Sequence, residues 1–460
     1  MNPSTAEGGV IPAEFQAKNN FDRTETLGTV FLGMTMICSR CHTHKYDPVT
    51  QTEYYELMAF FNSTAEGALD GNKYEYAPVI KVPQDQMSWN DWKRLQAERD
   101  RLLDETGKTF QNPQDIKSEA KQKWDKANKG ARLAMVVDEN GPWKKAGLTI
   151  HETAKRLAKR ISDAEKAFTT TLVAKELGKP RETKLLQRGE YNLPTGDALQ
   201  PGVLQVMGTL PEGAPRNRLS LAEWLTSRDQ PVVARVLVNR IWQRVFGEGL
   251  VRTPEDFGLQ GQQPTHPELL DWLASRFREA KFSVKAIHRL IMDSAAYRRS
   301  SRFDESVAAI DPNARLLWRF NRRRLSAEEI RDSILFVSGD LDLSFGGAHP
   351  FPAEGSWGSF SQHAPFYGLY PSNRRSLFLM QQRLKRHPFL ALFDGADPNV
   401  STPHRELTTV PTQSLYLMNS EFVHRQSAAP GGGGVGGGAG GGGRVRGRGG
   451  LALAGAAPRP

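Results

Sequence analysis

Cysteine usage constrains this chain more than any other feature of its sequence. The chain has 460 residues and two cysteines, and both lie within the pentapeptide Cys38-Ser39-Arg40-Cys41-His42. Two cysteines so close together cannot build a disulfide framework, so the fold has to rest on buried apolar side chains. The pattern C-x-x-C-H is typical of c-type haem attachment, in which two thiols bind the porphyrin and the histidine reaches the iron.

Three uses of these residues are open at this point. In a haem c site, Cys38 and Cys41 form thioethers and His42 is the proximal ligand. In a zinc site, Cys38, Cys41 and His44 bind one metal ion from a tight turn, and a fourth ligand such as Asp47 or a distant histidine is needed. In the third use, the two cysteines form a disulfide or remain as a reduced structural pair.

A distal haem ligand is not evident from the sequence. Four methionines are candidates, although the first three fit an apolar core equally well or better: Met34, Met36, Met58 and Met87.

Hydrophobic periodicity predicts a mainly α fold, with a first helical module, a helical arm and a larger helical domain with long loops and a few short strands. Thr50 with Glu53, and Ser326 with Glu329, are capping boxes that predict helix starts. The predicted helices are Thr50–Phe61, Trp89–Leu103, His151–Glu176, Ser220–Ser227, Val232–Phe246, His266–Glu279, Val284–Ala296 and Ser326–Val337.

The remaining segments are predicted from their Gly, Pro and charge content. Residues around Gly107–Gly147 are interpreted as loops in an arm with few buried contacts, and Thr183–Leu210 as a connector with short strands. The Gly/Arg-rich end is interpreted as disordered and possibly derived from a frameshift. The expected domain boundaries are 1–75, 76–182, 183–427 and 428–460.

Several motifs occur in one order along the chain and resemble two families. The stretches Phe31–Thr35, Cys38–Pro48, Tyr54-Tyr55 and Phe60–Asn62 resemble the C-terminal part of the planctomycete cytochrome-like domain PSCyt2 (DUF1549). The second half resembles its companion PSD1 (DUF1553), on the stretches Arg235–Trp242, Phe246–Val251, Thr253–Gly258, His266–Leu273, His288–Ile291, Ala296–Arg298, Trp318–Phe320, Arg323–Leu325, Ile330–Ser333, Asn419-Ser420 and Phe422–His424.

The resemblance implies a c-type haem protein associated with electron transfer, periplasmic or secreted, with an unidentified redox partner and partners in polysaccharide degradation. The first ten residues have neither the basic nor the apolar region of a signal peptide, so we expect a fragment of an exported parent protein. The sequence predicts no transmembrane segment. The net charge of +10 is spread among acidic residues or lies in local runs, so nucleic-acid binding is not expected.

Other candidate groups lack a diagnostic spacing, so the sequence assigns no catalytic residue and leaves enzymatic activity undecided. The acid–base candidates are Asp256, His266, Asp271, His288 and Asp332. His349 and His363 lie in a Gly-rich loop with Trp357, Phe366 and Tyr367, where a ligand surface is conceivable. A non-redox binding or scaffold protein, with C-x-x-C-H as a metal or structural site, is the alternative function.

Overall fold

The structure is a computed structural model that describes residues 11–68, 78–111, 118–345, 356, 359, 368, 371–382 and 385–429. The described chain is mainly helical, as the sequence predicts, with two antiparallel two-stranded sheets. None of the described helices is both long and apolar enough to span a membrane.

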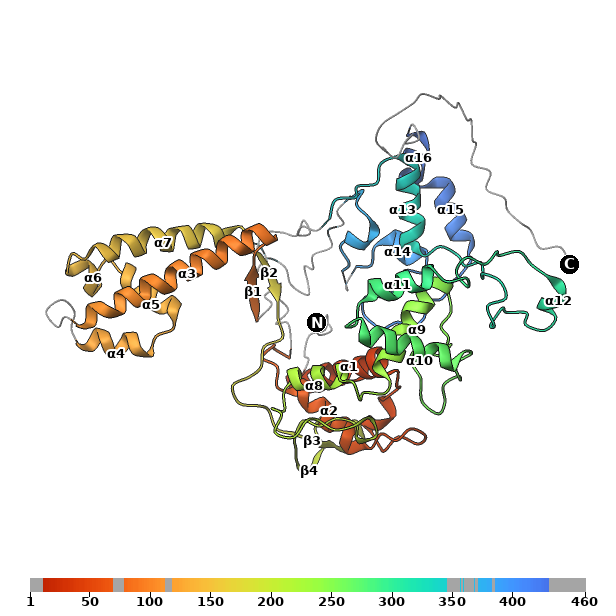
Figure 1. Ribbon diagram of the computed structural model, residues 1–460, viewed down its shortest axis with the longest axis horizontal. Coiled ribbons are helices and arrows are strands. Elements are labelled where there is room, and N and C mark those ends of the chain that lie inside the picture. Colours follow the sequence, from red (N-terminus) through yellow and green to blue (C-terminus); the bar gives the residue numbers. More distant parts are fainter. Residues whose placement is uncertain are drawn as a thin grey trace.

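The first unit is built from two helices around the cysteine motif (Figure 1). Helix α1 (Pro12–Leu27) continues into a π-helical turn, and α2 (Gln51–Asn62) packs against α1. The Thr50 hydroxyl accepts the backbone N–H of Glu53, and the Glu53 carboxylate in turn accepts the backbone N–H of Thr50, so this predicted capping box is confirmed. Such a cap contributes about 1 kcal/mol to a helix.

A hairpin from later in the chain completes this unit. Strands β3 (Thr183–Leu186) and β4 (Pro194–Leu199) pair antiparallel, and β3 packs on α2. Helix α8 (Arg218–Thr226) also contacts α2. The shared core therefore joins segments far apart in sequence, and includes Leu32, Tyr54, Tyr55, Leu57, Leu204, Leu221 and Trp224.

The arm is a second unit with a core of its own, and it projects to one side in Figure 1. Its long helices α3 (Gln86–Lys108) and α7 (Thr149–Lys166) pack together. Strands β1 (Val79–Val82) and β2 (Thr169–Leu172) pair at its base.

Two expectations for the arm were wrong. The stretch interpreted as loops contains α4 (Ser118–Lys126), α5 (Lys129–Val137) and α6 (Pro142–Lys145). Pro142 occupies the first position of α6, where proline is tolerated, so it starts a helix and does not break one. Instead of few buried contacts, Trp124, Val136 and Trp143 form a packed centre, with Trp143 fully buried.

A further correction concerns the end of α7. The sequence predicted a helix that continues to Glu176. In the structure α7 ends at Lys166, and the chain then forms β2 against β1. Three consecutive β-branched residues precede Leu172 in this strand, and such residues favour strands when a partner is available.

The C-terminal half holds two further cores. Helices α9 (Val233–Phe246), α10 (Pro267–Glu279) and α11 (Val284–Met292) surround Trp242 and Phe277. The short α12 (Glu305–Ala308) follows on a loop. The last core forms among α13 (Ala327–Ser338), α14 (Pro388–Leu392), α15 (Pro411–Asn419) and α16 (Glu421–Ala428). The Ser326–Glu329 capping box on α13 is confirmed.

Candidate functional site

The two cysteines and His42 are exposed residues of a single tight turn. Residues Ile37–Arg40 form a 3-10 turn, and the backbone N–H groups of Cys41 and His42 both donate to the carbonyl of Cys38, at 3.2 and 3.3 Å. Residues three apart are aligned in a 3-10 turn, which favours a common side for Cys38 and Cys41. Both cysteines are free and exposed, whereas Ser39 between them is fully buried.

The hydrogen bond made by Nδ1 of His42 leaves Nε2 of the same ring available as a ligand atom. Its Nδ1 lies 2.7 Å from the backbone carbonyl oxygen of Thr43. Because a carbonyl can only accept, Nδ1 carries the proton and donates it, and Nε2 of the neutral ring keeps its lone pair. A histidine that ligates iron or another metal uses this arrangement, with the second nitrogen held by a carbonyl.

Cys41 also contacts the β3–β4 hairpin. Its Sγ donates to the carbonyl oxygen of Arg188 at 3.2 Å. Gly189 follows with a φ of +75°, and a Cβ there would lie 3.3 Å from this Sγ and 3.1 Å from the side chain of Arg40. The hairpin connection therefore approaches the thiol closely, in a conformation that favours glycine.

Arg40 anchors the turn to both helices. Its guanidinium forms an ion pair with Glu25 of α1, with an Nη2–Oε1 distance of 2.5 Å, and lies over the ring of Phe21 at 4.4 Å. The hydroxyl of Tyr54 donates to the same Glu25 oxygen at 3.0 Å, and Tyr55 donates to the Arg40 carbonyl at 2.9 Å. Burial raises the pKa of both tyrosines, so they act as neutral donors that fix the turn.

Two of the residues that follow the turn, His44 and Asp47, have side chains that face the interior. The backbone N–H of Asp47 donates to Nδ1 of His44 at 2.8 Å, and the two side chains are only 4% and 8% exposed. Since Nδ1 accepts this bond, the neutral ring of His44 carries its proton on Nε2 and has no free lone pair. The predicted zinc ligand His44 is thus engaged away from the face that Cys38 and Cys41 share.

Asp47 reaches the second half of the chain. Its Oδ1 accepts the backbone N–H of Leu259 at 2.8 Å. Gly258 packs so closely on this carboxylate that a Cβ would lie 2.3 Å from Oδ1. Such a distance is far below van der Waals contact, so only glycine fits while Asp47 holds its place.

Further contacts between the two halves of the chain involve residues near Asp47. We use the name junction for all the residues that make these contacts: Thr29, Gly33, Asp47, Val236, Arg240, Phe257, Gly258 and Leu259. The carbonyl of Gly33 accepts the N–H of Phe257 at 2.7 Å. A Cβ on Gly33, whose φ is +57°, would lie 2.8 Å from Val236 and 2.9 Å from Phe257. Arg240 donates to the Thr29 carbonyl at 2.6 Å. Sequence reasoning missed the junction, because its partners lie about two hundred positions apart.

Three of the four methionines proposed as distal ligands are buried in the first core. Met34, Met36 and Met58 are at most 5% exposed and pack in the cluster around Leu32 and Tyr54. Met87 is 73% exposed and begins the arm helix α3. Among the described residues, no group of three or more His, Cys, Asp or Glu side chains is arranged to hold a metal ion.

The acid–base candidates of the second half lie on different elements and have structural contacts. Asp256 accepts the N–H of Gly258 at 2.8 Å, and Asp332 accepts the N–H and hydroxyl of Ser376. Arg235 pairs with Asp271 and lowers its pKa. His266 contacts Thr265 at the start of α10, and His288 lies on α11. His349, His363, Trp357, Phe366 and Tyr367 lie outside the described residues.

Comparison with family models gives two matches along the chain. Residues 1–66 match PSCyt2, described as a protein of unknown function (DUF1549), and residues 217–431 match PSD1, also of unknown function (DUF1553). The junction thus joins the two matched segments. No curated protein and no solved structure matches the chain.

Proposed function

The chain belongs to the proteins in which a PSCyt2 segment precedes a PSD1 segment, and on this premise we propose that its C-x-x-C-H turn attaches haem c and serves electron transfer. The observation that carries the proposal is the exposure of Cys38, Cys41 and His42 on one tight turn, with neither cysteine in a disulfide and, in the neutral ring, the lone pair of His42 on Nε2. When bound, haem c supplies one-electron transfer at its iron.

The side chains of the turn fit this group chemically. Cys38 and Cys41 would hold the porphyrin, and His42 would bind the iron through Nε2 while its Nδ1–H stays on the Thr43 carbonyl. Ile37 and Tyr46, close in sequence to the motif, are 52% and 47% exposed. Exposed apolar surface of this kind is suited to being covered by a porphyrin face or a partner.

The same proposal places the intact protein outside the cytoplasm, where haem c is attached, as a periplasmic or secreted protein with a redox partner. Partners that act in polysaccharide degradation remain part of this proposal through the family resemblance. The zinc alternative with Cys38, Cys41 and His44 has weaker support. In the neutral ring of the buried His44, Nδ1 accepts the backbone N–H of Asp47 and Nε2 carries the proton, so neither nitrogen has a lone pair free for a metal ion.

The test is covalent haem on the purified chain. The full chain is exported to a periplasm with cytochrome c maturation machinery and analysed by haem-peroxidase stain and pyridine haemochrome spectrum. We expect a haem band that survives denaturation, and its complete loss in Cys38→Ala/Cys41→Ala. His42→Ala removes the proximal ligand, and His424→Ala, an exposed histidine on α16, is its matched control.

The outcomes separate the two interpretations of the motif. A folded but colourless wild-type protein sinks the haem proposal. Zinc bound at one equivalent per chain, and lost in the cysteine double variant, would then favour the metal alternative.

A further inference from the structure

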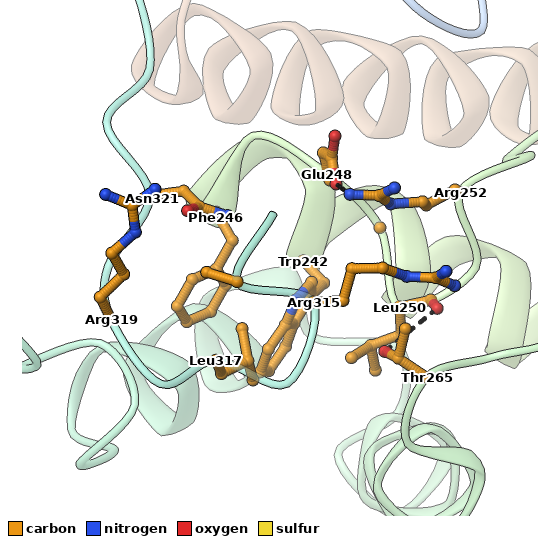
Figure 2. Close-up of a pocket in the computed structure, with 12 residues that line it drawn as sticks. Trp242, Phe246, Glu248, Leu250, Arg252, Thr265, Arg315, Leu317, Arg319 and Asn321 are labelled. Atoms are coloured by element: carbon orange, nitrogen blue, oxygen red, sulfur yellow. Dashed lines mark hydrogen bonds and ion pairs between the residues drawn. The ribbon is translucent and has the colours of Figure 1, made fainter. Parts of the chain in front are cut away.

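A pocket in the PSD1-matched half has a positive lining and lies apart from the cysteine turn in sequence. It forms where α9 ends, between the loop that follows this helix and the segment 314–321 (Figure 2). Its apolar wall is made of Trp242, Phe246, Leu250 and Leu317. The first three are at most 6% exposed, so the wall belongs to the packed core of α9 and α10 and is rigid.

The polar lining is dominated by guanidinium groups. Arg252, Arg315 and Arg319 line the pocket, and Glu248 is the one carboxylate in its lining. Glu248 forms an ion pair with Arg252. Figure 2 shows Arg252 reaching toward Glu248, whereas the guanidinium group of Arg315 extends in the other direction, beside Leu250 and Thr265. The lining therefore carries three positive charges against one negative charge.

The other two arginines have no carboxylate partner among the ion pairs of the described residues. Arg319 lies over the rings of Trp318 and Phe303, at 5.0 and 5.3 Å, and its Nε is buried with no hydrogen-bond acceptor in the described part of the chain. Arg315 has an exposed side chain, while its backbone N–H binds Asp311. A guanidinium group that lies beside an apolar wall without a carboxylate partner attracts an anion more strongly than one in bulk water.

We propose that this pocket binds an oxyanion group, namely a carboxylate, sulfate or phosphate, with Arg315 as its principal donor. The planar guanidinium fork matches the two oxygens of such groups. The cavity volume of about 30 Å³ suits a group of a few atoms, which can be a free ion or the charged end of a larger ligand. The apolar wall excludes water and strengthens the attraction.

The C-terminus of α9 is the main opposing feature, because its carbonyls carry a partial negative charge of about half an elementary charge. Glu248 adds one full negative charge. Together they remain below the three positive charges of the arginines, so the pocket keeps a net attraction for anions. Arg323 packs near Gly247 but is neutralised by Glu329.

The test measures binding to the full chain by isothermal titration calorimetry. Sulfate, inorganic phosphate and acetate are titrated at constant ionic strength, with benzoate as a probe of an oxyanion carried by a ring. We expect saturable binding of at least one of these anions to wild type. Arg315→Ala should weaken it by about tenfold or more, because a charged hydrogen bond is lost.

Two variants complete the design. Arg315→Lys keeps the charge but loses the fork, so affinity should fall between those of wild type and Arg315→Ala. Arg276→Ala removes an exposed arginine of α10 that pairs with Glu279, and it should bind like wild type. Benzoate competing with the bound anion indicates that a larger ligand is accepted, and binding of inorganic ions alone indicates a free-ion site. The proposal is overturned if wild type shows no saturable binding, or if Arg315→Ala binds as tightly as wild type.

Discussion

The cysteine turn and the residues that immediately follow it are neighbours in sequence but opposite in environment. Cys38, Cys41 and His42 are exposed, and their reactive atoms have few partners. His44 and Asp47 are buried, hydrogen-bonded to one another and, through Asp47, to Leu259 of the PSD1 segment. A single motif of about ten residues therefore presents chemistry on one side and fixes the junction on the other.

Under the proposed function, this short motif would both attach a cofactor and hold two segments of the chain together. A group that attaches a cofactor has to remain accessible, whereas a carboxylate that holds two segments together is effective when it is shielded from water. The junction also connects the first unit to α9 through Arg240 and the Thr29 carbonyl, and the C-terminal end of α9 contributes to the arginine-lined pocket.

The largest expected effect is on the buried side, at Gly258. Gly258→Ala places a Cβ against the Asp47 carboxylate, which has to move and lose its bond to Leu259. We expect the free energy of unfolding to fall by about 3 kcal/mol, measured by urea denaturation. Gly178→Ala is a matched control, because a Cβ at Gly178 meets nothing within 4 Å. An unchanged unfolding midpoint for Gly258→Ala would contradict the junction.

Asp47→Ala should have the next largest effect. It removes the acceptor of Leu259 N–H and should lower the free energy of unfolding by about 2 kcal/mol. The double variant Asp47→Ala/Gly258→Ala should cost less than the sum of the two single changes, because the new Cβ enters the space that the carboxylate leaves. Additive costs in this cycle would show that the two residues do not contact each other.

An exposed carboxylate elsewhere should contribute less than Asp47. Arg323 lowers the pKa of Glu329 to about 2, against an ordinary value of about 4.5, so its stabilisation is present above pH ~4.5 and is lost as the pH falls toward 2. Because the Glu329 side chain is 41% exposed, solvent screening reduces its contribution to about 1 kcal/mol. The stability difference between wild type and Glu329→Gln should shrink across this range; a difference independent of pH would contradict it.

The smallest effect should come from the exposed side of the motif. In the haem-free protein, Cys38→Ala/Cys41→Ala should change the free energy of unfolding by no more than about 0.5 kcal/mol, as for other exposed sites. The same variant should abolish haem attachment. A large loss of stability without haem would mean that the cysteines are structural, and the contrast with Asp47 would disappear.

Local signals were sufficient to predict several elements of this fold. The capping boxes at Thr50 and Ser326 start α2 and α13 as expected, because a cap depends on residues within one turn. The short strands of the connector are confirmed as β3 and β4. Where Gly and Pro were interpreted as loop signals, around Pro142, they lie at a helix boundary instead.

By itself, the sequence determined the mainly α class, the two family segments and the four residues that could attach a cofactor or metal (Cys38, Cys41, His42 and His44), because these depend on spacing along the chain. Only the tertiary structure decided that His44 and Asp47 face the junction while His42 stays exposed. It also decided that the arm has a core around Trp143 and that Asp47 meets Gly258 and Leu259. These outcomes depend on packing between residues distant in sequence, and no local pattern specifies which distant surface will exclude water from a given side chain.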